Sequence, residues 1–288
     1  MTVVYASGGL AALTLESIAD EAPAALPPRV RVTVTDVVSP LTFTLTRLCE
    51  GESWTVAGWR SRTFTDADTD LDWAAPLNRP VTYTLSANGS AICSATIILE
   101  SDTAIVQDPI QPDKFLPVST TGRDAGLLTM SSQALTSVEY RSEQSRIRVM
   151  GSPYPVAIGG QVSAASGVNV SVASYDAVTA SAFRGLRAGS PILLLRTSTD
   201  MVPLPSLAYL SAEVVEQPVN VHYGGSLTRW SVTGDLVAAV VQAAISGFVT
   251  YDEVQQLLAG VSYDEVQAAY GGLTYLDVQK TPLVYADL

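Results

Sequence analysis

Between Gly167 and Thr197 the hydrophobic residues change from one period to another, and this stretch is the clearest structural signal in the chain. Val168–Val172 alternates valine with polar residues, which is the period of a half-buried strand. The residues that follow have a helical period, and the continuous apolar run Ile192–Leu195 is typical of a buried strand. We therefore predict a strand, one short helix over 175–188 and a second strand.

The ends of this helix fit ordinary capping preferences. Ser174 can cap the N-terminus, with Asp176 in the first turn, because both side chains accept hydrogen bonds from free backbone N–H groups. Gly189 stands where helices commonly end, and Pro191 prevents continuation. The predicted apolar face consists of Val178, Ala182, Phe183 and Leu186, and the basic residues of the last turn are Arg184 and Arg187.

From Arg29 onward, short alternating runs predict strands with no helical period between them. The strongest signal is Asn88-Gly89 between two such runs, because both central residues of a type I′ turn need positive φ. Strands at this spacing predict an antiparallel β-sandwich of the immunoglobulin or fibronectin type. Seven further candidate strands and the helix then predict a β-barrel or sandwich with the helix packed on one side.

Prolines and glycines mark the predicted boundaries, because they interrupt both helix and strand. Val3–Ala6 and Leu13–Ile18 near the N-terminus have only a weak strand pattern, and a proline-broken linker follows them. The predicted organisation is an N-terminal arm over 1–28, a β-sandwich over 29–107, a linker over 108–126, a barrel over 127–235 and a helical repeat segment over 236–288.

The C-terminal segment contains the one internal repeat of the sequence. A motif of Thr or Ser, Tyr, any residue, an acidic residue, Val and Gln begins at Thr250, Ser262 and Thr274, every 12 positions. Its first and fourth residues form a helix-starting capping box, although helices this short are marginal in water on their own. We therefore expect them to dock on this chain, on another copy or on another protein. The predicted docking residues are Tyr251, Val254, Tyr263, Val266, Tyr275 and Val278.

The composition and net charge of the chain limit the kinds of ligand and partner that it can bind. Hydrophobic residues make up 47% and charged residues 15%, and the mean hydropathy is +0.25, so we expect partners to cover part of the surface. The net charge of −12 and two lysines, Lys114 and Lys280, argue against nucleic acid or an anionic membrane as ligand. The N-terminus has no signal-peptide pattern, and the longest apolar run, Leu236–Ala244, is too short to span a bilayer. We expect a protein that is made in a cytoplasm and stays soluble there.

Cys49 and Cys93 are the two cysteines, and both lie in apolar, strand-like contexts. Two buried reduced thiols are the favoured interpretation, since nothing in the sequence signals secretion. A disulfide between them stays open as the alternative.

Candidate metal ligands are confined to one acidic stretch. Asp66, Asp68, Asp70 and Asp72 alternate as in a calcium loop, but Leu71 and Leu77 replace the glycine and the bidentate acid that an EF-hand requires. A solvated acidic loop is the default interpretation. A looser calcium site at Asp66, Asp68 and Asp70 is the weak alternative.

No set of residues predicts catalysis. His222 is the only histidine, no Gly-x-Ser-x-Gly motif surrounds any serine, and no glycine pair has the pattern of a phosphate loop. We therefore predict a protein that is not an enzyme and has no catalytic residue and no cofactor. Trp54 and Trp59 with Arg60 would form a sugar-binding platform if exposed, although core packing of at least one tryptophan is favoured.

Six parts of the chain share a pattern with one known family. They are Arg29–Gly58, Asp72–Pro76 with Pro80–Thr84, Ile105–Pro109 with Pro112–Asp113 and Leu116–Val118, Val168–Arg196, Arg229–Val232 and the C-terminal repeats. These segments, in this order and over most of residues 29 to 280, resemble minor tail proteins of long-tailed phages that infect actinobacteria.

This resemblance implies a virion component of the tail tip or baseplate with a tail-tube-like second domain. It further implies contacts with other copies and with tail-tube, distal tail and hub proteins, assembly in the host cytoplasm and no catalytic residues. The alternative that stays open is a β-sandwich adhesin that recognises carbohydrate on the host surface.

Overall fold

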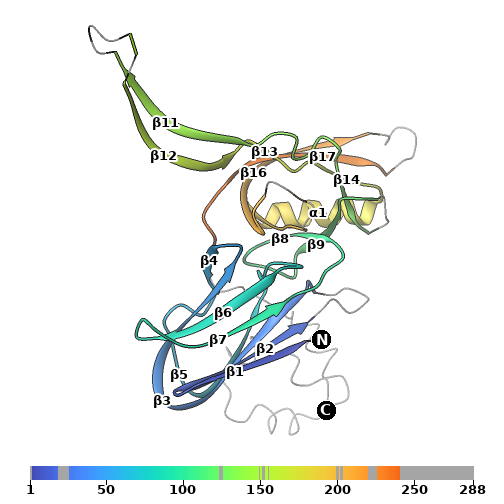
Figure 1. The fold of residues 1–288 in the computed structure, drawn as a ribbon. Coiled ribbons are helices and arrows are strands. Elements are labelled where there is room, and N and C mark those ends of the chain that lie inside the picture. The colour runs from blue at the N-terminus through green and yellow to red at the C-terminus, as the bar shows by residue number, and fades with distance from the viewer. Residues whose placement is uncertain are drawn as a thin grey trace, which may run out of the picture.

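The computed structural model describes residues 2–18, 26–122, 126–148, 150, 153–154, 156–198, 201, 204–219 and 226–240. These residues are mainly β, with one helix among them, and form two large sheets and a projecting hairpin (Figure 1). The predictions of a mainly β chain and of a barrel-like sheet with one packed helix are therefore confirmed.

The first sheet is antiparallel throughout and has the strand order β1-β2-β3-β6-β7, with β4 and β5 also paired to β3. Its strands are β1 (Val3–Gly8), β2 (Ala11–Ile18), β3 (Arg29–Cys49), β4 (Glu52–Thr55), β5 (Arg62–Asp72), β6 (Pro80–Ala87) and β7 (Ser90–Ile98).

The long strand β3 gives this sheet its shape. Its first part, Val30–Val34, lies between β2 and β5, whereas its last part pairs with β6 and β4. Between the two parts the register with β5 shifts twice, and Asp36 has a φ of 64°. Such irregularities bend a strand, and the sheet folds over so that β1 and β2 face β7. One apolar core that includes Leu13, Phe43 and Leu85 lies between the two halves.

The N-terminal residues belong to this sheet and do not form a separate arm. β1 pairs with β2, and β2 pairs with β3 along its whole length. Leu13 and Leu15 alternate into the core and are completely buried. The described part of residues 1–28, which we predicted to be an arm, therefore supplies two strands of the first sheet.

The predicted turn at Asn88-Gly89 is confirmed. It joins β6 to β7 with Ala87 opposite Ser90, and its φ angles are 52° at Asn88 and 80° at Gly89. These values suit a type I′ turn, whose twist matches that of the strands it joins.

The second sheet closes into a barrel. The strand order β13-β17-β14-β10-β9-β8-β15-β16 is completed by pairing of β16 with β17, and the pair β9–β10 is parallel. Its strands are β8 (Ala104–Gln107), β9 (Phe115–Ser119), β10 (Leu128–Met130), β13 (Val168–Asn169), β14 (Val172–Ser174), β15 (Ile192–Arg196), β16 (Leu207–Pro218) and β17 (Thr228–Leu236).

The barrel begins earlier in the chain than we predicted. We assigned residues up to 107 to the sandwich and 108–126 to a linker, but β8 and β9 pair with each other and with barrel strands. Asp108–Pro109 and Gln111–Pro112 only form the turn between them. Prolines mark a break in the strand but do not show that both sides of it join one sheet.

Helix α1 (Ala177–Gly189) fills one side of the barrel with Ala180, Phe183 and Leu186. Its N-cap is Asp176, which accepts hydrogen bonds from the N–H and the hydroxyl of Thr179, and not Ser174 as predicted. Ser174 is instead buried at the end of β14. Val178 and Ala182, which we placed on the apolar face, are exposed, Val178 to 80%. The buried face runs through Thr179, Phe183 and Leu186, and Val178, five residues from Phe183, lies on the other side of a helix with 3.6 residues per turn.

A two-stranded hairpin projects from the barrel (Figure 1). Its strands are β11 (Glu139–Ile147) and β12 (Val156–Ser166), which pair only with each other among the described strands. Its base lies where β12 ends and β13 begins, beside β17.

Candidate functional site: a charged junction and a projecting hairpin

The two sheets meet along the outer wall of the barrel. Leu193 and Leu195 of β15 face the barrel core, so Leu194 between them faces outward. Leu207 and Tyr209 of β16 lie on the same outer wall, and with Leu194 they pack against Trp54 of β4 and Ala74 just after β5. This apolar contact surrounds a cluster of buried charged and polar groups, which we call the junction.

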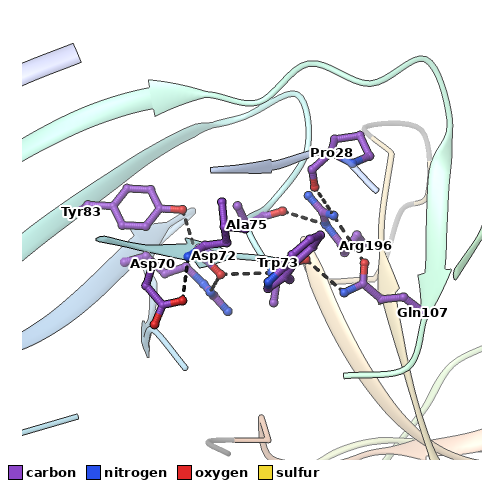
Figure 2. A network of polar contacts seen from close by, with 11 residues as sticks. Pro28, Asp70, Asp72, Trp73, Ala75, Tyr83, Gln107 and Arg196 are labelled. Carbon is purple, nitrogen blue, oxygen red and sulfur yellow. Dashed lines mark hydrogen bonds and ion pairs between the residues drawn. The ribbon is translucent and has the colours of Figure 1, made fainter. Parts of the chain in front are cut away.

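An arginine from each sheet reaches into the other. Arg196, at the end of β15, donates to the carbonyl oxygens of Ala75 (2.9 Å) and Pro28 (2.7 Å) on the first-sheet side (Figure 2). Arg79, which precedes β6, donates to the carbonyl oxygen of Thr197 at 3.0 Å on the barrel side and forms an ion pair with Glu50. The two sheets are therefore tied by directional hydrogen bonds in both directions.

Gln107 of β8 completes the contact around Arg196. Its amide nitrogen donates to the carbonyl oxygen of Trp73 at 3.0 Å, and its amide oxygen accepts from Arg196 at 3.4 Å (Figure 2). Gln107 is 1% exposed, so these bonds form away from water. Its side chain thus bridges the barrel and the loop after β5.

Asp72, the last residue of β5, is the centre of the first-sheet part of the junction. One carboxylate oxygen accepts from Arg47 at 2.5 Å and from the backbone N–H of Ala74 at 3.0 Å. The other accepts from the Tyr83 hydroxyl at 2.8 Å. Because both oxygens are already engaged, this carboxylate is arranged to hold neighbouring groups in place.

The pKa values in the junction follow from burial and from the charge of Asp72. Burial lowers the pKa of the Arg196 guanidinium to about 10, so it stays charged at neutral pH. Burial acts in the same direction on Arg47, but Asp72, Tyr209 and Tyr83 together outweigh this effect and raise the pKa of Arg47. Burial, with the nearby carboxylate of Asp72, raises the pKa of Tyr83 well above its usual value, and burial raises that of Tyr209.

Positive charge exceeds negative charge in the deepest part of the junction. Arg47 and Arg196 are 2% and 0% exposed, and Asp72 is the one carboxylate that contacts this pair among the described residues. Nε of Arg47 and Nη2 of Arg196 have no hydrogen-bond partner in the described part of the chain. A cavity of about 40 Å³ borders Arg47, Asp72 and Tyr209. This volume suits a water molecule and is far too small for a substrate.

The β11–β12 hairpin is the second candidate site, because it exposes large apolar side chains. Tyr140, Ile147 and Val156 are 58%, 49% and 51% exposed, and Met150 near the tip is 99% exposed. A two-stranded ribbon is marginal in water without further packing. The hairpin therefore has the character of a surface that another molecule covers.

The acidic stretch is a strand and not the loop that we predicted. Asp66, Asp68 and Asp70 lie in β5, and Arg62 of the same strand forms ion pairs with Asp68 and Asp70. An arginine between two carboxylates occupies the position that a cation would take. Nowhere in the described ranges do three His, Cys, Asp or Glu side chains come together in a way that could hold a metal ion.

The proposed aromatic platform does not exist in the predicted form. Trp59 is completely buried in the core of the first sheet, as favoured from the sequence, whereas Trp54 is half-buried at the junction. Cys49 and Cys93 are buried free thiols, as predicted. His222 and the predicted docking residues of the C-terminal repeats lie outside the described residues.

Comparison of the chain with protein-family models, with curated proteins and with solved structures found no match. In the described ranges, no helix is long and apolar enough to cross a membrane.

Sequence reasoning missed the junction. Arg47, Arg79 and Arg196 were not singled out as functional residues. Arg47 nevertheless takes the next alternate position after Phe43 and Leu45, and Arg196 follows the apolar run Ile192–Leu195, two places where a long cationic side chain is unusual. This placement of arginines in strands is the one signal of the junction in the sequence. The partners of Arg79 and Arg196 include backbone carbonyls, which every residue has.

Proposed function

We propose that the chain is a structural minor tail protein of a phage virion, assembled at the tail tip or baseplate through contacts between subunits. The single observation that carries the proposal is the projecting hairpin. Apart from Ala165 at its base, which is buried in the barrel core, it adds no described residue to either sheet core. It instead exposes Tyr140, Ile147 and Val156 on a ribbon that needs external packing.

The junction supports the same function. A subunit that is repeated in an assembly must place its contact surfaces at fixed distances from one another. The exchanged hydrogen bonds of Arg79 and Arg196 hold the barrel and the first sheet at one angle, because hydrogen bonds are directional. The barrel with one packed helix is the tail-tube-like domain in this proposal, and the first sheet is the immunoglobulin-like one.

Partners are other copies and neighbouring tail proteins. Copies of a chain with a net charge of −12 repel each other wherever acidic side chains meet. Contacts between copies are therefore favoured on apolar and hydroxyl-bearing surface, which the low content of charged residues leaves available. The alternative, a carbohydrate-binding adhesin, loses its best candidate surface because Trp59 is in the core.

The proposal is tested by removing the apolar character of the hairpin in the full chain. A Tyr140→Ser, Ile147→Ser variant should melt at the wild-type temperature, because neither side chain belongs to a core. It should then be lost from purified phage particles when supplied in place of the wild-type chain, as measured by mass spectrometry of the particles.

Val38→Ser is the matched control. Val38 is 94% exposed at the bend of β3, far along the first sheet from the barrel. This variant should enter particles as the wild type does. Equal incorporation of the hairpin variant, or absence of the wild-type chain from particles, would refute the proposal.

A further inference from the structure

Strand β1 is an end strand of the first sheet and pairs with β2 on one side (Figure 1). Just before it, the carbonyl oxygen of Thr2 accepts from the N–H of Ser17 at 2.9 Å, and the N–H of Thr2 donates to the Ser17 hydroxyl at 2.8 Å. The backbone groups of Thr2 therefore face β2. Hydrogen-bonded and non-hydrogen-bonded pairs alternate along antiparallel strands, so Val3, Tyr5 and Ser7 turn their N–H and C=O groups away from β2.

The residues with outward backbone groups also have exposed side chains. Val3 and Tyr5 are 54% and 62% exposed, and Ser7 is exposed as well, whereas Val4 and Ala6 between them pack against the core of the first sheet. In the described part of the chain, β1 has no strand on its outer side. Such a row of N–H and C=O groups is a template on which another strand can pair.

The other edges of the first sheet are less suited to pairing. β5 pairs with β3 alone, shifts register twice and carries one arginine and four aspartates. β7 has a register shift against β6, and β4 has four residues. Charges, bulges and short length are the features that keep sheet edges from joining. β1 has no charged residue, no proline and no register shift against β2.

A second copy of this chain fits the β1 edge by charge and by symmetry. Copies with a net charge of −12 repel each other at acidic surface, but β1 is uncharged, and the Glu16 side chain beside it is 17% exposed and paired with Arg31. Antiparallel pairing about a two-fold axis at Tyr5 sets Tyr5 against the partner's Tyr5 and Val3 against the partner's Ser7. This register pairs every outward backbone group of β1 in both copies.

We propose that β1 is a self-association edge: two copies pair through β1 about a two-fold axis, and their first sheets become one continuous sheet. Six outward residues, three from each copy, then exchange backbone hydrogen bonds, and the two Tyr5 rings lie side by side on the exposed face. This inference goes beyond the proposed function and does not depend on it, because the purified chain forms this contact without any other protein.

The register is tested by cross-linking single-cysteine variants of the full chain, whose own Cys49 and Cys93 are buried. Tyr5→Cys should cross-link to itself with a thiol reagent that spans about 5 Å, because opposite Cα atoms lie about 5.5 Å apart. Val3→Cys alone should not, since the two copies of that residue are offset by about 13 Å along the strands. A mixture of Val3→Cys and Ser7→Cys chains should cross-link as a heterodimer.

The energetic test is Tyr5→Lys, measured by sedimentation equilibrium. It removes the aromatic pair and sets two like charges opposite each other, so the dimer dissociation constant should rise by about tenfold or more. Val38→Lys is the matched control, because it makes the same change of charge at a residue that is 94% exposed at the bend of β3. It should dimerise as the wild type does, and both variants should keep the wild-type melting temperature because neither side chain belongs to a core.

A wild-type chain that stays monomeric and gives no Tyr5→Cys cross-link would overturn the inference. Equal cross-linking of Tyr5→Cys and Val3→Cys would also overturn it, since that result indicates random collision. So would a dimer that survives Tyr5→Lys but is lost in the Tyr140→Ser, Ile147→Ser variant, because the contact would then lie on the hairpin. A monomeric chain that still enters phage particles leaves the proposed function standing, whereas a β1 dimer that never enters particles refutes only the proposed function.

Discussion

Replacing Arg196 by methionine should loosen the barrel from the first sheet while leaving each folded. Methionine is unbranched and flexible, so it can fill much of the same space without a charge. The substitution removes the donors to Ala75 and Pro28, which are two of the bonds that tie the sheets together. It leaves the cores of both sheets intact, because Arg196 belongs to neither apolar cluster.

The expected magnitude is a balance of two opposing effects. Hydrogen bonds from a charged group to the two carbonyls are worth about 1.5–3 kcal/mol each, and their loss leaves buried acceptors unpaired. Against this, methionine removes a charge whose burial lowers its pKa to about 10, a cost of about 3 kcal/mol at about 1.4 kcal/mol per pKa unit. We expect a net loss of about 2 kcal/mol, or about 4–8 °C in melting temperature.

The decisive assay follows each sheet separately during denaturation. Trp54, Trp59 and Trp73 report on the first sheet, and Trp230 reports on the barrel. In a Trp230→Phe background, fluorescence follows the first sheet alone, while circular dichroism follows both. The two signals should coincide in the otherwise wild-type chain and should separate when Arg196 is replaced.

Arg31→Met is the control. Arg31 forms an exposed ion pair with Glu16, with side chains 47% and 17% exposed, and such pairs contribute at most about 1 kcal/mol. If Arg196→Met is no less stable than Arg31→Met and its two signals still coincide, the junction does not couple the sheets and the reasoning above is refuted.

Five further substitutions test particular parts of the fold by urea denaturation. Asp176→Ala should cost about 1 kcal/mol and Asp176→Asn much less, because asparagine also caps helices. A hydrogen bond from the Thr179 backbone lowers the pKa of Asp176 in the folded chain. The stabilisation that Asp176 contributes is therefore complete above its unfolded pKa of about 4. It is lost as the pH falls through the lower folded pKa. Gly234→Ala should destabilise strongly, since the new Cβ would lie 2.6 Å from the Ser211 carbonyl oxygen, whereas Gly185→Ala in open space should add about 0.5–1 kcal/mol. Trp59→Ala should cost about 3–5 kcal/mol as a core residue; a small loss would place it outside the core.

Local patterns predicted the elements of this fold better than their assembly. The alternation of Leu13 and Leu15 was visible, but nothing near it showed that β2 pairs with β3 beyond a proline-broken stretch. In the same way, the prolines around Asp108 were taken as a linker, although β8 and β9 pair across them. Pairing depends on residues that are distant in sequence, and a single sequence contains no direct record of it.

The junction could not be predicted for a different reason. The acceptors of Arg196 are the backbone carbonyls of Ala75 and Pro28, and every residue has such a carbonyl. The side chains of Ala75 and Pro28 therefore do not predict the hydrogen bonds that their carbonyl oxygens accept from Arg196. A side-chain pair such as Arg47 with Asp72 could be suspected from the sequence, but the alternating aspartates of β5 were interpreted as a solvated acidic loop, with a calcium site as the weak alternative.

The buried ion pair raises the question of whether it serves stability or a fixed geometry. Buried ion pairs are often no better for stability than apolar residues of the same volume, because desolvation offsets their attraction. A triple variant, Arg47→Met, Asp72→Leu and Tyr83→Phe, should therefore be as stable as the wild type or more stable, by about 1–4 kcal/mol.

The same variant should hold the two sheets less uniquely, since Arg47 interacts with Tyr209 of the barrel and the directional bond to Asp72 holds Arg47 in place. Small-angle scattering should then show a broader distribution of distances although the melting temperature is unchanged or higher, and incorporation into particles should fall. If the triple variant is destabilised by several kcal/mol and keeps its wild-type scattering curve, the pair contributes stability and not geometry. The fixed angle between the barrel and the first sheet would then depend on the hydrogen bonds of Arg79 and Arg196 alone.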